Sequence, residues 1–332
     1  MKIGGYDVRK GEKLRGRIKV LKLANQCEVT IPILILNGAE EGPVFWINGA
    51  VHGDELNGSV GAKNVFERLD PKEVRGTLVV TPIANPLAFQ NKQKHSFMDH
   101  LDMDQMFPGD PTGLPTQRIA YHLFGLIREN ADYLLSLHSN GTAFRAKPYI
   151  VYKRVPNTPA EVFRKIEEMA LTFGLKANCC VDIGSAKGEL PGVTAGALDI
   201  TCIQNGIPAF MLEAGRGGRI QNENVKIAET GILNTMKLLN MVSGDIRKPE
   251  EKQIIITKRM FFRSDYAGMS QVFGEPGSFM KKGETIARVF DWVEGEHMIK
   301  APEDMYIICS RCHTVVDEGD RLAFVGTEWR DR

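Results

Sequence analysis

The chain has 332 residues, of which 43% are hydrophobic and 25% are charged, as in an ordinary globular protein. Its 42 basic and 41 acidic side chains leave a formal net charge of +1, which argues against a nucleic-acid surface or a membrane-attracting face. The N-terminus lacks an apolar core of signal-peptide length and no apolar run could span a bilayer, so we expect a cytoplasmic protein.

The first part of the chain alternates predicted strands with a helix. Apolar runs at residues 31–36 and 43–49 predict two strands, and the periodic segment 56–69 predicts a helix. A further strand is expected at 77–83. A polar stretch without periodicity, 90–113, follows it, and a loop of that length inside a compact domain is usually functional or a wrong assignment.

The alternation continues after this stretch. We expect a helix at 116–129, a strand at 133–137, a helix at 159–173, a buried strand at 207–212 and a helix at 222–239. Strands that alternate with helices indicate an α/β fold, with a mostly parallel central sheet and helices flanking both faces.

The composition changes near Pro249. Beyond it no helical pattern is evident, and short strands are expected at 254–257, 285–290 and 305–309, between turns rich in Gly and Asp. We therefore predict two domains, a large one at 1–248 and a small all-β one at 249–332.

The first candidate ligands follow the strand at 43–49. His52 and Glu55 are three residues apart where this strand gives way to a helix, so an imidazole and a carboxylate can turn toward one point. Alone the spacing is weak, because a chance His-x-x-Glu in a turn is common and a hydrogen-bonded loop histidine is the more frequent outcome.

A third candidate ligand, His138, follows the strand at 133–137. The carboxyl ends of parallel strands share one edge of a sheet, so two strands would deliver His52, Glu55 and His138 to the same place. Two histidines and one carboxylate leave a fourth position open, as in catalytic rather than structural zinc sites.

An acidic residue, Glu213, ends the apolar strand predicted at 207–212. Beside a metal-activated water, this carboxylate would act as a general base and then as an acid toward the leaving amine. Without the metal ligands, a salt-bridged or helix-capping glutamate would be the preferred interpretation.

These segments resemble the succinylglutamate desuccinylase/aspartoacylase family of the zinc carboxypeptidase-like superfamily. The matching segments are Gly49-Ala50-Val51-His52-Gly53-Asp54-Glu55, Ala84-Asn85-Pro86, Phe107-Pro108-Gly109, Leu137-His138-Ser139 and the run from Gly206 to Glu213. The resemblance implies that His52, Glu55 and His138 bind one zinc ion per chain and that Glu213 is the catalytic carboxylate. It also implies a deacylase that hydrolyses the amide of a small N-acylated amino acid or amine.

The C-terminal segment resembles the small β-barrel-like domain of the same family, which is similar to lipoyl and biotinyl carriers. Ala267-Gly268, Lys281-Lys282-Gly283-Glu284, Ala301-Pro302 and Asp317-Glu318-Gly319-Asp320 carry this likeness. The hairpin motif that presents a modifiable lysine in carriers is missing, so Lys300 is expected to be an ordinary surface lysine.

The substrate loop departs from the family pattern. Members commonly carry Asp-Leu-Asn-Arg, whose Asn and Arg hold a substrate carboxylate, whereas this chain has Asp104 and Gln105 at those two places. A neutral amide replaces a guanidinium, and Asp104 would repel a carboxylate and favour a cationic or neutral group. Lys94 and Arg145 are expected either to restore an anion site or to be solvated surface charges.

Other functions remain open at this point. A zinc carboxypeptidase-like peptidase is an alternative that the weakened carboxylate anchor disfavours, and a non-catalytic zinc-binding family member is another. A carrier-type interaction protein built on the C-terminal domain is a further alternative. We expect a small-molecule partner, no nucleic acid and no membrane, and a homo-oligomer is compatible with the sequence.

Overall fold

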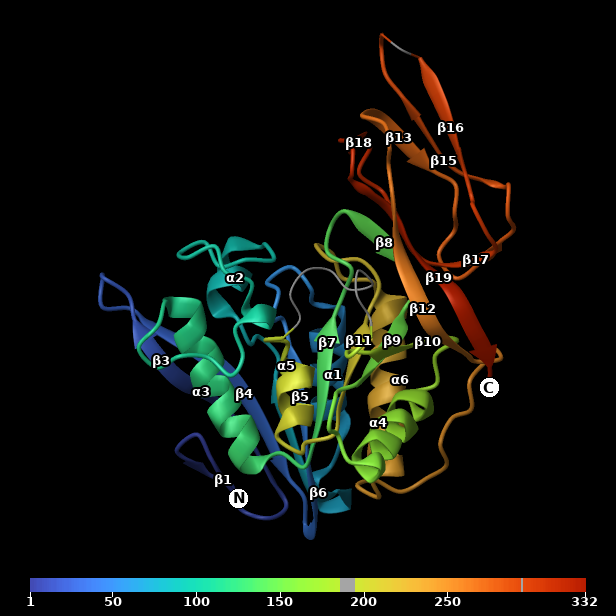
Figure 1. The fold of residues 1–332 in the computed structure, drawn as a ribbon. Coiled ribbons are helices and arrows are strands. Elements are labelled where there is room, and N and C mark those ends of the chain that lie inside the picture. Colours follow the sequence, from blue (N-terminus) through green and yellow to red (C-terminus); the bar gives the residue numbers. More distant parts are fainter. Residues whose placement is uncertain (186–194, 294) are drawn as a thin grey trace.

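A large β-sheet forms the centre of the protein in the computed structural model (Figure 1). The structure describes residues 1–185, 195–293 and 295–332, and within them this sheet has 13 strands. In spatial order they are β14 (Phe279–Met280), β17 (Met305–Arg311), β19 (Arg321–Asp331), β12 (Ile254–Arg263), β10 (Ala177–Asp182), β9 (Tyr149–Arg154), β11 (Ala209–Glu213), β7 (Tyr133–His138), β5 (Glu40–Gly49), β6 (Arg75–Thr81), β4 (Glu28–Asn37) and β3 (Glu12–Lys22), with β8 (Phe144–Ala146) paired to β17.

The remaining strands form two smaller sheets. One consists of β16 (Glu296–Lys300), β15 (Thr285–Phe290), β13 (Gly268–Val272) and β18 (Val315–Val316), and the other of β1 (Lys2–Ile3) and β2 (Tyr6–Asp7). The α-helices are α1 (Asn57–Arg68), α2 (Pro86–Asn91), α3 (Pro115–Asn130), α4 (Ala160–Thr172), α5 (Leu198–Gln204) and α6 (Asn222–Leu238). Two short 3₁₀ turns, η1 (Pro71–Glu73) and η2 (Met103–Gln105), complete the described elements.

The central sheet is mixed, which corrects the expectation of a mostly parallel sheet. Parallel pairs form two groups. In one, β5 lies between β6 and β7 and β7 pairs with β11, and in the other β10 lies between β9 and β12. On one side β4 runs antiparallel to both β6 and β3. Between the two groups β9 is antiparallel to β11, and at the C-terminal edge β19 is antiparallel to both β12 and β17. Short connections such as the one between β3 and β4 suffice for antiparallel neighbours, whereas parallel neighbours need a longer crossover.

Helices cover both faces of the sheet. Gly58 of α1 lies so close to Leu137 of β7 that a Cβ atom there would be 2.8 Å from the Leu137 Cβ, and α1 packs on α6, which contacts α4. Successive strand residues point to opposite faces, so His138 points away from this layer. Helix α5 lies on the His138 face, because it contacts β7 and β11 and its Asp199 pairs with Lys153 of β9.

The last third of the chain continues the central sheet. The first residues of β12, Ile254 to Ile256, pair with β10 as well as with β19, and Ile255 belongs to the main hydrophobic core. Beyond them, the C-terminal strands project from the helical part of the molecule (Figure 1) and enclose a core of their own around Ile286, Ile307 and Val325. The division into 1–248 and 249–332 therefore stays a prediction, since the sheet crosses it.

Most of the predicted elements are confirmed with small shifts at their ends. The helices expected at 56–69, 116–129, 159–173 and 222–239 are α1, α3, α4 and α6, and the expected strands are β4, β5, β6, β7, β11, β12, β15 and β17. The described part of the chain beyond residue 249 contains strands and no helix, as expected. Among the described residues, no helix combines the length and the apolar character that crossing a membrane requires.

Candidate active site

The loop between β5 and α1 carries the first two candidate ligands. Gly53 allows this loop to lie directly against the backbone of α2, because a Cβ atom there would be only 2.0 Å from the carbonyl carbon of Ala88. The amide of Glu55 donates to the carbonyl oxygen of His52 at 3.2 Å, which closes a turn between the two residues. The turn and the close approach together bring the His52 and Glu55 side chains to the same point.

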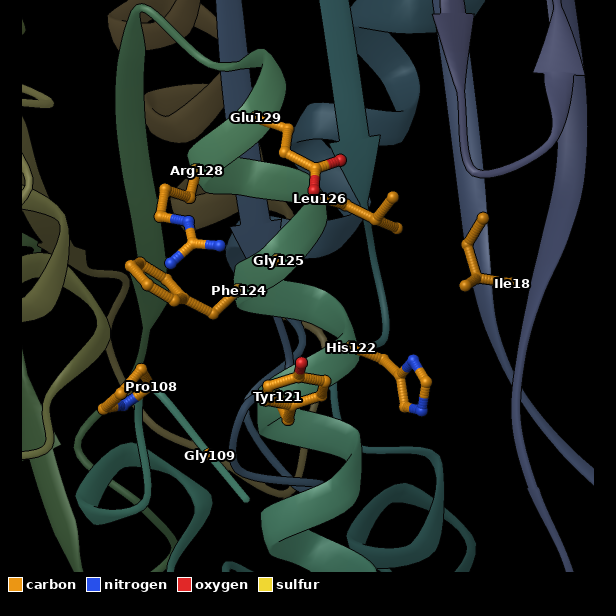
Figure 2. Close-up of a pocket in the computed structure, with 10 residues that line it drawn as sticks. All are labelled: Ile18, Pro108, Gly109, Tyr121, His122, Phe124, Gly125, Leu126, Arg128 and Glu129. Atoms are coloured by element: carbon orange, nitrogen blue, oxygen red, sulfur yellow. The ribbon is translucent and has the colours of Figure 1, made fainter. Parts of the chain in front are cut away.

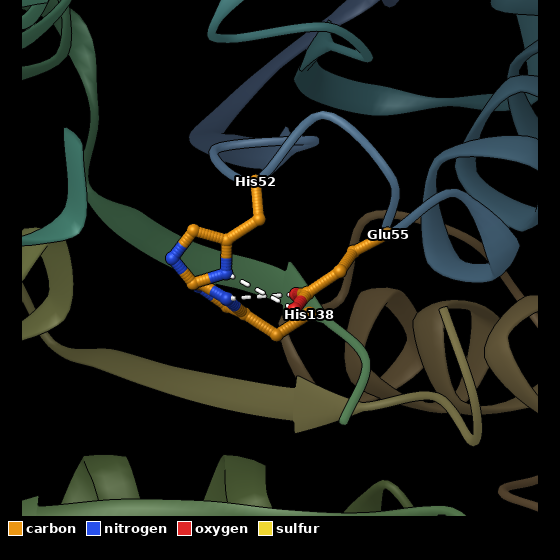
Figure 3. Close-up of side chains that lie close together, drawn as sticks. All are labelled: His52, Glu55 and His138. Carbon is orange, nitrogen blue, oxygen red and sulfur yellow. Dashed lines mark ion pairs between the residues drawn. The ribbon is translucent and has the colours of Figure 1, made fainter. Parts of the chain in front are cut away.

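The structure brings His52, Glu55 and His138 together in a buried cluster (Figure 3). The Nδ1 atom of His52 lies 3.1 Å from Glu55 Oε1, and the Nδ1 atom of His138 lies 3.3 Å from Glu55 Oε2. One donor atom from each of the three side chains lies within 4.8 Å of the other two. This cluster matches the donor set of catalytic zinc sites.

The outer nitrogen of each imidazole has a partner of its own. His52 Nε2 lies 3.0 Å from Asp102 Oδ1, and His138 Nε2 lies 3.0 Å from the Ser136 hydroxyl. An imidazole that donates from Nε2 keeps its lone pair on Nδ1, the nitrogen that faces the cluster. Both Nδ1 atoms are thus oriented as metal ligands, and His52 Nδ1 is buried without a hydrogen-bond partner among the described residues.

The electrostatics of the cluster favour a bound cation. Burial lowers the pKa of His52, but Glu55 and Asp102 outweigh it and raise this pKa to about 10. Burial also disfavours the charged form of Glu55, yet the two histidines hold the pKa of Glu55 well below its usual range. In addition, the backbone N–H of Ser139 donates to Glu55 Oε2 at 2.8 Å. The negative charge of Glu55 can be balanced by a proton on a neighbouring imidazole, and a metal ion can take the place of that proton. The residues present therefore fit a metal ion.

Glu213 lies beside this cluster. It ends β11 in register with His138 of β7 and with Tyr149 of β9, so these three side chains share one face of the sheet. The Glu213 Oε2 atom is buried and has no hydrogen-bond partner among the described residues. Burial, and then the nearby charge of Glu55, raise the pKa of Glu213 to about 7. A carboxyl group with a pKa near neutrality can both accept and donate a proton in one reaction.

Two of the four predicted substrate residues point to Asp102. Lys94 Nζ lies 2.9 Å from Asp102 Oδ2, and Gln105 Nε2 donates to the same oxygen at 3.2 Å. Asp102 also accepts the backbone N–H of Asp104 at 3.0 Å. Burial would raise the pKa of Asp102, but His52 and Lys94 hold it far below its usual range. Asp102 therefore stays anionic and ties the predicted substrate loop to His52.

Asp104 is held at the start of α5. Its Oδ1 atom accepts the backbone N–H of Leu198 at 3.2 Å, and the N–H of Phe107 donates to the carbonyl oxygen of Gly196 at 3.0 Å. A Cβ atom on Gly196 would lie 2.1 Å from the carbonyl oxygen of Gln105, so only glycine permits this contact. The segment that contains Asp104 is consequently fixed against the backbone at 196–198.

Arg145 is the predicted substrate residue that the structure directs elsewhere. It belongs to β8, and its guanidinium forms an ion pair with Glu275 at 2.8 Å, in the C-terminal part of the chain. Its side chain is 41% exposed. It does not contact the cluster, so its predicted role is not supported by a contact.

A separate hollow of about 370 Å³ lies between α3 and β3 (Figure 2). Its walls include Ile18 of β3, Tyr121, His122 and Arg128 of α3, and the loop residue Pro108. None of its lining residues belongs to the His-Glu-His cluster, so it is not part of the candidate active site.

Sequence analysis missed the role of Asp102 and of the buried pair Lys153 and Asp199. Asp102 occupies the first position of the segment that corresponds to the family's Asp-Leu-Asn-Arg. A metal-binding histidine commonly donates its other N–H to a carboxylate, so Asp102 could have been predicted as a partner of His52. Lys153 Nζ lies 2.7 Å from Asp199 Oδ1 and both side chains are almost fully buried. No sequence signal connects these two residues, which are 46 positions apart.

Proteins of a known family are similar over the segments that form this site. A family model described as the succinylglutamate desuccinylase/aspartoacylase catalytic domain matches residues 41–239. A curated relative from Halomonas elongata, named N-alpha-acetyl-L-2,4-diaminobutyric acid deacetylase, is 27% identical over 304 residues, which are 90% of this chain and 85% of the relative.

Solved structures share the whole fold. A succinylglutamate desuccinylase/aspartoacylase from Rhodobacter sphaeroides superposes with a TM-score of 0.85 at 23% identity, covering 98% of this chain and 97% of its own. The product-bound ectoine utilization protein EutE (DoeB) from Ruegeria pomeroyi gives a TM-score of 0.86 at 22% identity, covering 97% of each chain. At this level of identity the two structures support the fold, an α/β architecture with a large mixed sheet and a C-terminal β region.

Proposed function

The chain belongs to the succinylglutamate desuccinylase/aspartoacylase family, and we propose that it is a zinc-dependent amidohydrolase that removes the acyl group from an N-acyl amino acid. The observation that carries the proposal is the buried His52, Glu55 and His138 cluster, beside which Glu213 Oε2 has no hydrogen-bond partner in the described part of the chain. The deacetylase from Halomonas elongata, which is similar over most of both chains, supports the same reaction class.

In this proposal His52 Nδ1, His138 Nδ1 and the Glu55 carboxylate hold one zinc ion. Zinc bound there would supply a Lewis acid toward the amide carbonyl oxygen and would lower the pKa of a water beside it. Asp102 and Ser136 orient the two imidazoles through their outer nitrogens, and the Ser139 N–H orients Glu55. The site's own residues thus fix both the position and the protonation state of the ligands.

Glu213 is the proposed general base and acid. Its carboxylate accepts a proton from the water that attacks the amide carbon, and the resulting carboxylic acid donates this proton to the leaving nitrogen as the carbon–nitrogen bond breaks. A pKa of about 7 suits both steps, because neither protonation state is strongly disfavoured near neutral pH. The products are a carboxylate and a free amine.

A panel of N-acyl amino acids tests this function. Zinc-loaded protein is incubated with each compound, free amine is measured, and the Glu213→Gln variant serves as the matched control because it keeps the shape of the side chain. We expect hydrolysis of at least one compound by the unaltered protein and a large loss with the variant. Equal release of amine by both proteins, or none by either, would contradict the proposal.

A further inference from the structure

We propose that the substrate of this site carries a cationic amino group besides the amide that is cleaved, and that Asp104 binds this group. The inference rests on the proposed function, because it concerns the substrate of the same site. The proposed function leaves the charge of the substrate open, and the inference specifies this charge and the residue that recognises it.

Asp104 is fixed next to the metal-binding cluster. It lies in η2, two residues after Asp102, which contacts His52, and its Oδ1 atom accepts the N–H of Leu198. Its backbone N–H donates to Asp102 Oδ1, the same oxygen atom that faces His52 Nε2. The carboxylate is therefore close enough to the reacting amide to contact another group of the same small molecule.

The cationic side chains that could reach this place are engaged in ion pairs elsewhere. Lys94 contacts Asp102, Lys153 contacts Asp199, and Arg145 contacts Glu275. Gln105, which stands where the family carries an arginine, donates its amide N–H to Asp102. Within the described part of the chain, Asp104 has no ion-pair partner, and Lys94 and Gln105 are directed at Asp102 instead.

The buried pair behind Asp104 adds a second carboxylate. Asp199 Oδ1 accepts from Lys153 Nζ at 2.7 Å and from the N–H of Ile200 at 2.8 Å. Asp199 Oδ2 is buried and lacks a hydrogen-bond partner among the described residues, and the charge of Asp199 acts on Asp104. Asp199 thus already takes the Lys153 ammonium, and the additional negative charge of Asp104 favours a second cation.

An ammonium group on the substrate would complete this arrangement. A half-buried carboxylate without a cation is unfavourable, and burial accordingly raises the pKa of Asp104. A charge-assisted contact from the substrate would replace the hydration that Asp104 loses on burial. Such a contact typically changes relative affinity or kcat/KM by roughly 10- to 100-fold. A substrate carboxylate at the same place would be repelled by Asp104.

The test compares compounds that differ only in this charge. Nα-acetylornithine and Nα-acetylnorleucine have the same shape, with a methyl group replacing the ammonium, and Nα-acetyl-2,4-diaminobutyrate and Nα-acetylnorvaline form a shorter pair. The kcat/KM ratio of the cationic to the neutral member is measured for the zinc-loaded protein. We expect roughly 10- to 100-fold in favour of the cationic member of the better pair.

Asp104→Asn should lower this ratio to near one, because asparagine loses the charge but keeps the acceptor for Leu198. Asp110→Asn is the matched control, since Asp110 also accepts a backbone N–H, from Thr112 at 2.7 Å, but is not part of the site. This control should leave the ratio unchanged.

An equal or higher kcat/KM for the neutral members, or an unchanged ratio in Asp104→Asn, would overturn the inference while leaving the proposed function intact. If none of the four compounds is hydrolysed, the proposed function is in question, and calorimetric binding to zinc-loaded Glu213→Gln then decides the inference. Tighter binding of the cationic members supports it, and equal binding overturns it.

Discussion

Asp102 and His52 are joined by a contact of 3.0 Å between Oδ1 and Nε2, on the side of the ring opposite to Glu55. The same imidazole directs Nδ1 at Glu55. Asp102 lies in the segment that also carries Lys94, Asp104 and Gln105, so one carboxylate links the predicted substrate loop to a proposed zinc ligand.

Replacement of Asp102 by asparagine should weaken zinc binding. The neutral amide no longer balances the imidazole and can present either its oxygen or its nitrogen to Nε2, so the tautomer of His52 is no longer fixed. Losses of this kind are typically about 10- to 100-fold in metal affinity. Competition with a chelating dye measures the affinity, and Asp99→Asn is the control, because Asp99 contacts Thr116 rather than a histidine. Equal affinities in all three proteins would contradict the assignment.

Glu213→Gln should keep its zinc and lose most of its activity. The amide cannot accept a proton from the attacking water, and general acid–base catalysis typically contributes about 100- to 10,000-fold. Zinc content and kcat are measured on the same preparation. A variant that retains its metal and a nearly normal rate would assign the base to another residue.

The raised pKa of Glu213 also predicts a pH dependence of stability in metal-free protein. The pKa rises from an ordinary 4.5 to about 7 on folding, so the folded state holds this proton more tightly. The stabilisation is complete below the unfolded pKa and is lost as the pH rises toward 7, with a slope of at most about 1.4 kcal/mol per pH unit. Urea unfolding of the unaltered protein and of Glu213→Gln between pH 4.5 and 8 measures it. A constant difference between the two proteins would contradict this environment for Glu213.

The buried pair of Lys153 and Asp199 predicts a stability effect of its own. Lys153→Met leaves the Asp199 carboxylate uncompensated in the interior, which typically costs about 3–5 kcal/mol. Adding Asp199→Leu removes the second charge, and replacing a buried ion pair by apolar side chains is often neutral. The midpoint of urea unfolding should therefore fall in the single variant and recover in the double variant. A double variant that is less stable than the single one would show that the pair is a net source of stability.

The sequence predicted which side chains lie together where the local pattern of apolar and polar residues marks the end of a strand. An apolar run followed by a polar residue marks the carboxyl end of a buried strand, and β5, β7 and β11 lie side by side and parallel. That arrangement is sufficient to bring His52, His138 and Glu213 to one edge of the sheet. The antiparallel course of β9 and the continuation of the sheet into β12 depend on contacts between distant segments, which strand patterns do not reveal.

The substrate loop shows where sequence reasoning was insufficient. The segment 90–113 has no periodicity, and its side chains are positioned by individual hydrogen bonds to Asp102 and to the backbone at 196–198. Arg145 follows His138 closely in the chain, yet its partner Glu275 is 130 positions away. The sequence showed which loop residues are charged, but it could not show which residue each of them contacts.

Metal removal tests the central claim most directly. The protein is stripped with a chelator, its hydrolysis of the best N-acyl amino acid is measured, and zinc is then added back in steps, with His52→Ala and His138→Ala treated in parallel. We expect no activity without metal, full recovery at one zinc per chain, and neither tight zinc binding nor recovery in the two variants. Full activity in the stripped protein, or one tightly held zinc in both variants, would contradict the account.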